Sequence, residues 1–306
     1  MKTSTADPGL EAYLAGARLR VDAVLARWGE DAERFWPPPV PAAVRHSLLG
    51  SGKRLRPTLV FAAYDAMGGT APAVAQLAAA VEVVHAYSLV HDDLPSMDDD
   101  DLRRGRPTTH RAFDVPTATR AGFHMVGLAA RVLASGMAAL DLSPERRQAI
   151  ALALFRAAGA GGMIGGQVLD LGAEGRRVPI AELNDVHRRK TGALIAAACV
   201  IGGLAAGDLV PPAHVEALRA YGEAIGLAFQ IADDVLDATG TSAQLGKTPG
   251  KDAAHAKSTF VTLLGVGAAR AEAERLAAQA VDRLREAGLV SPVLVALADY
   301  IVTRPN

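Results

Sequence analysis

The chain has few of the residues that mark several common protein classes. It contains one cysteine in 306 residues, Cys199, so an intramolecular disulfide is impossible and the cytoplasm is the expected compartment. Its formal net charge is −1, which argues against a nucleic-acid-binding protein because such proteins carry a basic surplus. Only 5% of its residues are aromatic, and no alternating apolar and polar run predicts a β-strand. These absences favour a helical globular protein.

Membrane-directing segments are also scarce. Residues 1–14 lack a basic segment followed by an apolar run, so no signal peptide is expected. The one membrane-like stretch, residues 192–206, is short for a span and is interrupted by Gly202 and Gly203. We therefore predict no membrane span and interpret this stretch as a buried core helix.

Apolar residues recur at helical spacing through most of the chain. Leu10, Leu14, Val21 and Leu25 predict an amphipathic first helix, and the prolines at 37–41 predict a linker after it. Further helices are expected over residues 44–49, 57–67, 73–94, 117–140, 144–171, 180–206 and 212–237. A polar loop at 240–257 precedes two or three shorter helices. The expected fold is a single all-α domain over residues 1–306, with long, buried central helices.

Two acidic clusters end apolar helices. The first, residues 91–105, holds six aspartates and then Arg103 and Arg104. Pro95 is expected to end the helix so that Asp98 folds back toward Asp92 and Asp93. For the neighbouring aspartates at 99–101, a solvated acidic loop explains the sequence equally well.

The second cluster places Asp233 and Asp237 one helical turn apart, with Asp234 beside them. Like charges at the end of an apolar helix repel one another and are poorly solvated, so such a cluster requires a compensating cation. Carboxylates without histidine or thiolate partners select a hard ion, and Mg²⁺ fills its other positions with water and phosphate oxygens. The alternative is a solvated helix end.

Basic residues stand where a phosphate group would need them, beside glycines and at helix ends: Lys53, Arg54, Arg56, Arg103, Arg104, Lys190, Lys247, Lys251 and Lys257. Each of them alone is most simply a surface charge. A nucleotide-binding P-loop at residues 50–53 is excluded, because Ser47 stands where that motif needs glycine and Arg54 follows the lysine.

The order and spacing of these motifs resemble the trans-isoprenyl diphosphate synthases. The resemblance rests on both aspartate motifs and on four further stretches, residues 52–57, 165–170, 190–192 and 229–230, and it extends from about residue 48 to residue 304. The four-residue spacer between Asp93 and Asp98 is similar to that of the bacterial farnesyl diphosphate synthases.

This resemblance implies a bundle of long antiparallel helices around a deep apolar cavity, with both aspartate clusters at its mouth. It implies three Mg²⁺ ions bridging an allylic diphosphate, with metal ligands or their close support from Asp92, Asp93, Asp98, Asp233, Asp234 and Asp237. Arg103, Lys190 and Lys257 would hold the allylic diphosphate, and Lys53, Arg56, His85 and Arg104 would hold isopentenyl diphosphate. Thr191 and Gln230 would line the reacting carbons, and Lys247 would close over the leaving group. From the sequence alone, His85 is equally well a core histidine.

The implied reaction is head-to-tail prenyl transfer, in which an allylic diphosphate ionises and its cation is captured by isopentenyl diphosphate. Tyr87, beside Ser88 and just beyond one turn from Asp92, resembles the bulky cavity floor of C15 synthases, although it is also consistent with ordinary core packing. Farnesyl diphosphate is therefore the expected product, and geranylgeranyl diphosphate is the alternative.

Two positions depart from the family pattern. Phe123-His124 stands where an aspartate is usual, and Val261 stands where a proline is usual. These departures place the cavity shape in question and keep open a non-catalytic or regulatory subunit that binds prenyl diphosphates. A terpene cyclase is a third option, but its second metal motif differs from residues 233–237. The resemblance also implies a homodimer.

Overall fold

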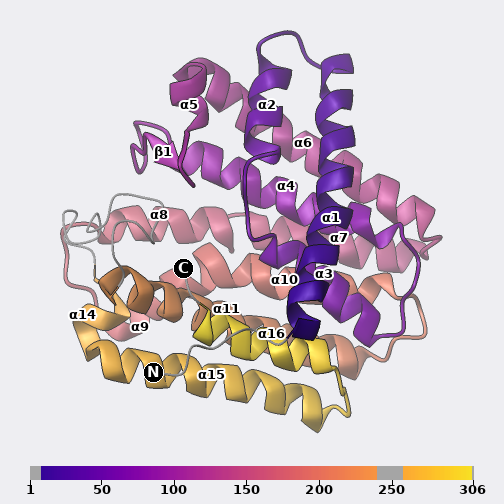
Figure 1. Ribbon diagram of the computed structural model, residues 1–306, viewed down its shortest axis with the longest axis vertical. Helices are drawn as coiled ribbons and strands as arrows, with labels where there is room; N and C mark the ends of the chain where they lie inside the picture. The colour runs from indigo at the N-terminus through magenta and orange to yellow at the C-terminus, as the bar shows by residue number, and fades with distance from the viewer. Residues whose placement is uncertain (1–7, 240–257, 305–306) are drawn as a thin grey trace.

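A computed structural model describes residues 8–239 and 258–304 of the chain (Figure 1). Its helices are α1 (Pro8–Asp31), a 3₁₀ turn η1 (Ala32–Arg34), α2 (Val40–Leu48), α3 (Leu55–Ala66), α4 (Val74–Asp92), α5 (Thr109–Ala112), α6 (Val115–Ala139), α7 (Pro144–Ala158), α8 (Met163–Ala173), α9 (Ile180–His187), a π-helical turn η2 (Arg188–Gly192), α10 (Ala193–Ala205), α11 (Pro212–Thr239), α14 (Phe260–Leu264), α15 (Val266–Glu286) and α16 (Pro292–Thr303). The all-α prediction is confirmed.

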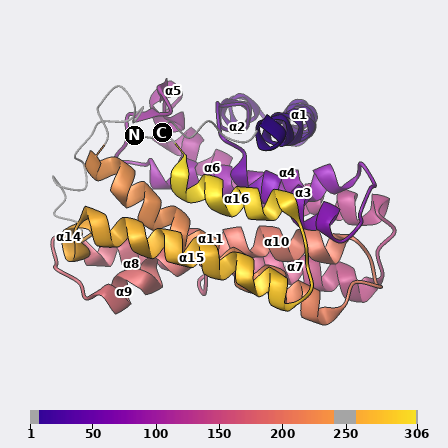
Figure 2. The same ribbon diagram turned by 60° about the horizontal axis from the view of Figure 1, so that its bottom comes forward.

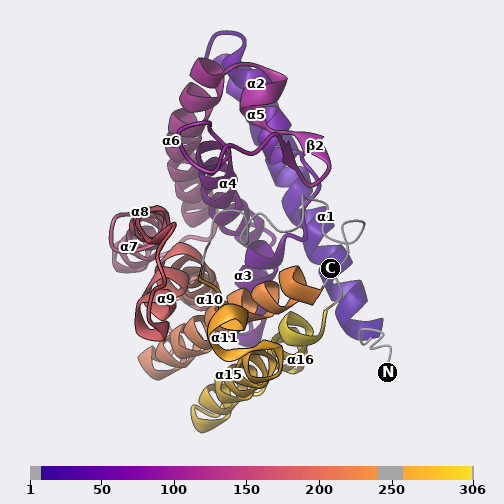
Figure 3. The same ribbon diagram turned by 90° about the vertical axis from the view of Figure 1, so that its left-hand side faces the viewer.

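The core forms around two helices that are apolar nearly all round. In α10 nearly every side chain is buried, from Leu194 to Ala205, and the helix packs against α3, α7 and α11. In α4 the burial runs from Val74 to Val90, and this helix packs against α1, α3 and α6. Figure 3 shows α4 and α6 side by side, and Figure 2 shows α15 and α16 covering α11. The stretch that looked membrane-like is therefore a core helix, as predicted.

The segments that could span a membrane by length and composition differ from the stretch considered in the sequence analysis. Among the described residues, three segments are long and apolar enough to cross a bilayer by length and composition alone: Val74–Asp92, Val115–Ala139 and Pro144–Ala173. The buried shares of their most apolar windows are 72%, 50% and 39%. The absence of a membrane span stays a prediction.

The prediction of one helix over residues 144–171 was wrong, because the chain breaks between α7 and α8. Gly159 and Gly162 both adopt non-helical conformations there, at φ/ψ of −80°/−164° and −126°/−127°. Glycine has the largest conformational freedom to lose in a helix, so paired glycines are natural break points. The break separates the start of α8 from the end of α7 and lets α8 approach the π turn η2.

A small hairpin was not predicted. Strands β1 (Leu102–Arg103) and β2 (Arg106–Pro107) pair antiparallel directly after the first acidic cluster. Its two loop residues, Arg104 and Gly105, have φ of 52° and 75°, the conformation of a type I′ turn. Two-residue strands carry no periodicity, so the arginine–glycine pair was the only signal. The hairpin fixes Arg103 and Arg104 beside the aspartates.

Other element boundaries shifted by a few residues. α2 begins at Val40 rather than residue 44, because Pro41 lies in its first turn, where a missing N–H costs nothing. The short η1 and α5 were not predicted. Three helices, α14 to α16, complete the described chain, in agreement with the expected two or three.

Candidate active site

The first acidic cluster folds back on the end of α4 as the sequence predicted. The Asp98 backbone N–H donates to the Asp92 carbonyl at 2.8 Å, and the Asp100 N–H donates to the Asp93 carbonyl at 3.2 Å. The turn places Asp92 and Asp98 close enough for their charges to interact. One backbone turn thus gathers carboxylates that are six residues apart.

Asp93 is the most buried member of this cluster, and its partner is Arg103 of the hairpin. Arg103 Nε donates to Asp93 Oδ1 at 3.0 Å, and a second guanidinium N–H reaches the same oxygen. Arg103 Nη2 also donates to Asp100 Oδ2 at 3.1 Å. Arg103 therefore ties the hairpin to the acidic turn.

The second cluster divides its aspartates between two roles. Asp233 pairs with Arg304, at the end of the described chain, with Nη2 to Oδ1 at 2.5 Å, and the Arg304 guanidinium lies 4.1 Å from the Phe229 ring centroid. Asp234 is buried and accepts the backbone N–H of Phe260 at 2.9 Å, so it holds the start of α14. Asp237 is half-buried on the same turn.

Four side-chain hydrogen bonds lie between the two clusters, on α8, η2 and α11. From the first cluster, Asp98 accepts from Gln167 Nε2 at 3.4 Å. Lys190 then donates to Asp170 at 2.6 Å, Thr191 donates to Gln230 at 2.9 Å, and Gln230 donates to Asp234 at 3.4 Å. Both clusters therefore border one site, built from helices far apart in sequence.

The π turn η2 is what presents Lys190 and Thr191 to this site. A π turn holds one residue more than an α-helical turn, and such turns are frequent at functional sites. Gly166 of α8 packs directly against it: a Cβ atom at this position would lie 2.1 Å from the Lys190 backbone nitrogen. Only glycine allows this approach.

Arg56, Arg104 and His85 lie close together and form what we call the basic wall of the site. Beside it is a cavity of about 60 Å³, whose lining includes His85, Arg103 and Arg104. Arg104 Nη1 donates to the Ser51 carbonyl at 2.8 Å, which joins the hairpin to the loop before α3. Arg56 Nε is buried with no hydrogen-bond partner among the described residues. Burial and the nearby Arg104 lower the pKa of Arg56 to about 10 despite the opposing charge of Glu82. An unpartnered buried guanidinium N–H is a ready site for an anion.

The pKa values of buried acidic and basic groups in the site shift in opposite directions. The pKa of Asp92 is raised to about 7, chiefly by burial and also by the charges of Asp98 and Asp93, with Lys190 and Arg103 opposing the rise. Burial likewise raises the pKa of Asp233, which Arg304 opposes. Burial, together with the guanidinium of Arg56, holds the pKa of His85 well below its usual range, so His85 is neutral at pH 7. Burial thus raises the pKa of the aspartates Asp92 and Asp233 and lowers the pKa of Arg56 and His85.

The donor set fits magnesium bound together with a substrate. Among the described residues, no group of three or more histidine, cysteine, aspartate or glutamate side chains is arranged to hold a metal by itself. Magnesium ordinarily takes one or two carboxylates and completes its shell with water and phosphate oxygens. Asp92 and Asp98 on one side and Asp233 on the other offer such partial sets.

The residues expected at the cavity floor are buried in α4. The Tyr87 ring lies 6.0 Å from the ring of His91, centroid to centroid, in an edge-on contact, and Ser88 donates to the His85 carbonyl at 2.9 Å. The Phe123 ring also lies 5.2 Å from the His91 ring, centroid to centroid, but Phe123 is 66% exposed, so it does not fill the core.

The other departures from the family pattern are also accommodated. His124 stacks on Trp36, with the two ring centroids 4.8 Å apart. Val261 lies in α14, whose start is fixed by a capping box of Thr259 and Thr262, so the helix forms without a proline.

Several site residues received no individual role from the sequence. Gln167 and Asp170 lie within a motif that the sequence singled out, and their spacing of three on α8 was the available signal. Arg304 was marked by no local pattern. Lys247, Lys251 and Lys257 lie outside the described residues, so their predicted roles are untested.

Comparison with known proteins identifies the family of this chain. The polyprenyl synthetase family model matches residues 38–293. The chain is 47% identical over 269 residues to the farnesyl diphosphate synthase of Escherichia coli, covering 87% of this chain and 89% of that protein. It is 42% identical over 272 residues to geranylgeranyl pyrophosphate synthase 12 of Arabidopsis thaliana, covering 86% and 74%. A Helicobacter pylori geranyltransferase, solved with magnesium and isoprenyl diphosphate, superposes with a TM-score of 0.80 at 29% identity, covering 98% of both chains. The match over most of the chain shows that the protein belongs to the polyprenyl synthetase family.

Proposed function

We propose that the protein is a magnesium-dependent prenyltransferase that condenses isopentenyl diphosphate with an allylic diphosphate of five or ten carbons to give farnesyl diphosphate. The observation that carries this proposal is the set of side-chain hydrogen bonds that places Lys190, Thr191 and Gln230 between the two aspartate clusters. It faces a basic wall with an unpartnered Arg56 N–H. A site with separate acidic and basic sides suits two diphosphates, one bound through metal and one bound directly.

Each diphosphate has its own set of side chains in this proposal. Asp92, Asp93, Asp98 and Asp233 would hold the metal ions, with support from Asp234 and Asp237; three ions are proposed. When bound, magnesium supplies positive charge to the leaving diphosphate. Arg103, Lys190 and Lys257 would hold the allylic diphosphate, and Lys53, Arg56, His85 and Arg104 would hold isopentenyl diphosphate.

The chemistry follows from where these charges lie. As the allylic C–O bond breaks, Lys190 and Arg103 stabilise the charge that develops on the leaving oxygens, and such fixed cations act most strongly where water is excluded. Thr191 and Gln230 would line the carbons between the two diphosphates, and Lys247 would close over the leaving group. The double bond of isopentenyl diphosphate captures the cation, and the proton released goes to the departing diphosphate. His85, being neutral, binds by hydrogen bonding without adding charge.

The direct test is one incubation of the purified protein with isopentenyl diphosphate, Mg²⁺ and a C5, C10 or C15 allylic starter, followed by product sizing. We expect a C15 product from the C5 and C10 starters and none when EDTA is present. A C20 product as the main species would support the geranylgeranyl alternative, which the similarity to the Arabidopsis enzyme keeps open. No product with any starter would support a non-catalytic subunit. The cytoplasmic location stays a prediction.

Tyr87 tests the product-length proposal. Replacing Tyr87 by alanine removes a buried ring one turn beyond the first aspartates, so longer chains would be accommodated. We expect products of C20 or longer to exceed the C15 product, as measured by chromatography of the dephosphorylated alcohols. Leu209→Ala, which changes a loop leucine that is 98% exposed, is the control. An unchanged product distribution in Tyr87→Ala would remove Tyr87 as the floor.

We also propose a homodimer that uses the exposed apolar face of α6. Phe123 and Val126 lie on this face, three residues apart on one helical surface, with their side chains in solvent. Phe123→Asp is expected to convert a dimer to a monomer in sedimentation velocity. Leu209→Asp changes an isolated loop leucine that is 98% exposed and should leave the dimer intact. A wild-type monomer would contradict the proposal.

A further inference from the structure

Arg54 stands between two proposed diphosphate ligands in the sequence, but its guanidinium group is bound by the protein itself. Lys53 precedes it and Arg56 follows two residues later, and the sequence placed all three among the candidate phosphate-binding residues. In the structure Arg54 is 5% exposed, and its backbone adopts a left-handed conformation with φ of 50°. A non-glycine residue in this conformation is uncommon and needs support from its surroundings.

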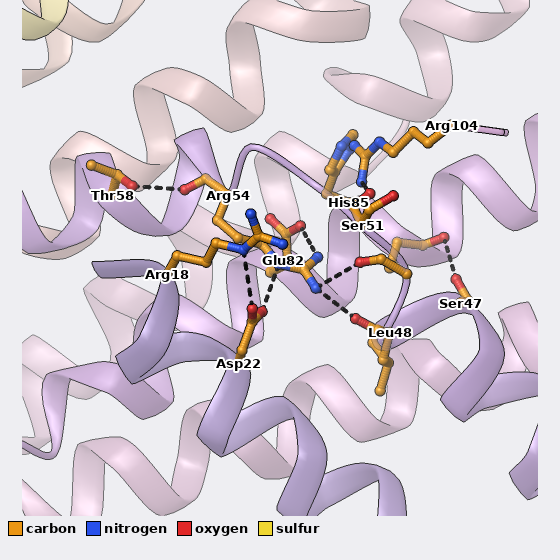
Figure 4. Close-up of polar contacts among 12 residues, drawn as sticks. Arg18, Asp22, Ser47, Leu48, Ser51, Arg54, Thr58, Glu82, His85 and Arg104 are labelled. Atoms are coloured by element: carbon orange, nitrogen blue, oxygen red, sulfur yellow. Dashed lines mark hydrogen bonds and ion pairs between the residues drawn. The ribbon is translucent and has the colours of Figure 1, made fainter. Parts of the chain in front are cut away.

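The support comes from four hydrogen bonds of its guanidinium group (Figure 4). Nε donates to Asp22 of α1 at 2.8 Å, and Nη1 donates to Glu82 of α4 at 2.8 Å. Nη2 donates to the carbonyls of Leu48 at 2.9 Å and Gly50 at 3.1 Å. The group is therefore committed to the protein and is not free to bind phosphate.

These contacts fix the loop that carries the ligands. Arg54 is the residue before the first turn of α3, and its carbonyl accepts both the backbone N–H of Thr58 at 3.0 Å and the Thr58 hydroxyl at 2.8 Å. Arg56 is the second residue of that helix, so its direction depends on where the helix starts. Lys53 precedes the turn. The guanidinium thus clamps residues 48–54 to α1 and α4 at the point between the two ligands.

Arg54 has a second effect on the basic wall, because its positive charge compensates the negative charge of Glu82. Glu82 is 3% exposed and its charge acts on both Arg56 and Arg104. It lies three residues before His85, on the same side of α4. Without Arg54, a buried carboxylate would be left to attract the guanidinium groups that the isopentenyl diphosphate needs.

We propose that Arg54 is a positioning residue that sets the affinity for isopentenyl diphosphate by clamping the Lys53–Arg56 turn and neutralising Glu82. The inference rests on the proposed function of Lys53, Arg56 and His85. It predicts a selective defect, because none of the four Arg54 bonds reaches the acidic side of the site, which serves the allylic diphosphate.

The experiment measures isopentenyl diphosphate binding to the full chain by calorimetry, with the KM of the allylic substrate measured alongside. Arg54→Gly tolerates the left-handed backbone but removes the clamp, and we expect its affinity to fall at least tenfold while the allylic KM stays within twofold. Asp22→Asn removes the charge of one half-exposed partner, and a smaller loss of about threefold is expected from a surface-facing pair. Arg54→Lys, which keeps the charge but not the four bonds, should recover only part of the affinity.

Arg146→Ala is the matched control. This arginine also donates to two backbone carbonyls, those of Asp208 at 3.1 Å and Val210 at 3.0 Å, and pairs with Asp208, where α10 connects to α11. Wild-type affinity in a folded Arg54→Gly protein, or equal losses for both substrates, would overturn the inference. If Arg54→Gly fails to fold, Asp22→Asn decides, and unchanged affinity there overturns the inference too. Unchanged binding in Arg56→Gln would instead refute the proposed isopentenyl site itself.

Discussion

Replacing Asp92 by asparagine is expected to lower kcat by two to three orders of magnitude. Asp92 ends α4, faces Asp98 across the folded-back turn and is acted on by Lys190, so it lies where the acidic and cationic parts of the site meet. Asparagine keeps the shape but removes the negative charge that would hold a divalent cation. Losing one preorganised electrostatic group in an active site typically costs a factor of about 10²–10³. Steady-state product formation at saturating substrates and Mg²⁺ measures the loss.

Asp99→Asn is the control for that experiment. Asp99 lies in the same turn, is exposed and has φ of 48°, a conformation that asparagine tolerates well. Its activity should stay within about twofold of wild type, since an exposed charge contributes little. Equal losses in both variants would mean that the overall negative charge of the turn matters, and not a ligand at Asp92. Near-normal activity in Asp92→Asn would remove it from the metal site.

Lys190→Gln is expected to lower kcat/KM for the allylic substrate by about a hundredfold. The Lys190 ammonium pairs with Asp170 at 2.6 Å and acts on Asp92, so it faces the proposed position of the leaving diphosphate. Its removal takes away a fixed positive charge and leaves Asp170 without that partner, a combined effect of about 3 kcal/mol, which corresponds to that factor. The KM of isopentenyl diphosphate, whose proposed ligands are Lys53, Arg56, His85 and Arg104, should change little.

The neighbouring Arg189 offers a matched comparison. Arg189→Gln removes a positive charge one residue away, from a side chain that pairs with Asp185 on the preceding turn. Such exposed pairs contribute only about 0.2–1 kcal/mol, so we expect near-normal kinetics. If Arg189→Gln were as defective as Lys190→Gln, the effect would reflect damage to the π turn and not the loss of a substrate contact.

The helical core was predictable because its signal is strong and local. Apolar residues fill α4 and α10 on nearly every face, and only a buried helix accommodates such a pattern. The break between α7 and α8 was not predicted, because Gly159 and Gly162 fall inside an otherwise helical apolar run and isolated glycines are often tolerated. The type I′ turn at Arg104–Gly105 was missed because its strands are only two residues each.

Within the site, the sequence predicted which residues would cluster but not which of their side chains bind other groups of the protein. Asp98 folds back to Asp92 as the sequence predicted, and the metal-binding roles of Asp92, Asp98 and Asp233 stay predictions. The sequence could not distinguish the structural roles of Asp234 and Arg54 from the roles of neighbours with the same charge. The direction of each side chain depends on partners far along the chain, and Asp234 for example holds the start of α14. Arg304 reaches Asp233 across 71 residues, a contact that no local pattern could indicate.

The π turn at Arg188–Gly192 has a consequence for how this region tolerates insertions and deletions. Because it holds one residue more than an ordinary turn, it behaves as a single-residue insertion within an uninterrupted helix. Deleting one residue there would restore regular α-helical winding within the turn and leave the flanking helices α9 and α10 in place, because the π turn absorbs the extra residue. Thr191 would then swing off Gln230 while the surrounding helices kept their apolar register. Length variants at this turn would therefore fold but lose the alignment between the two halves of the site.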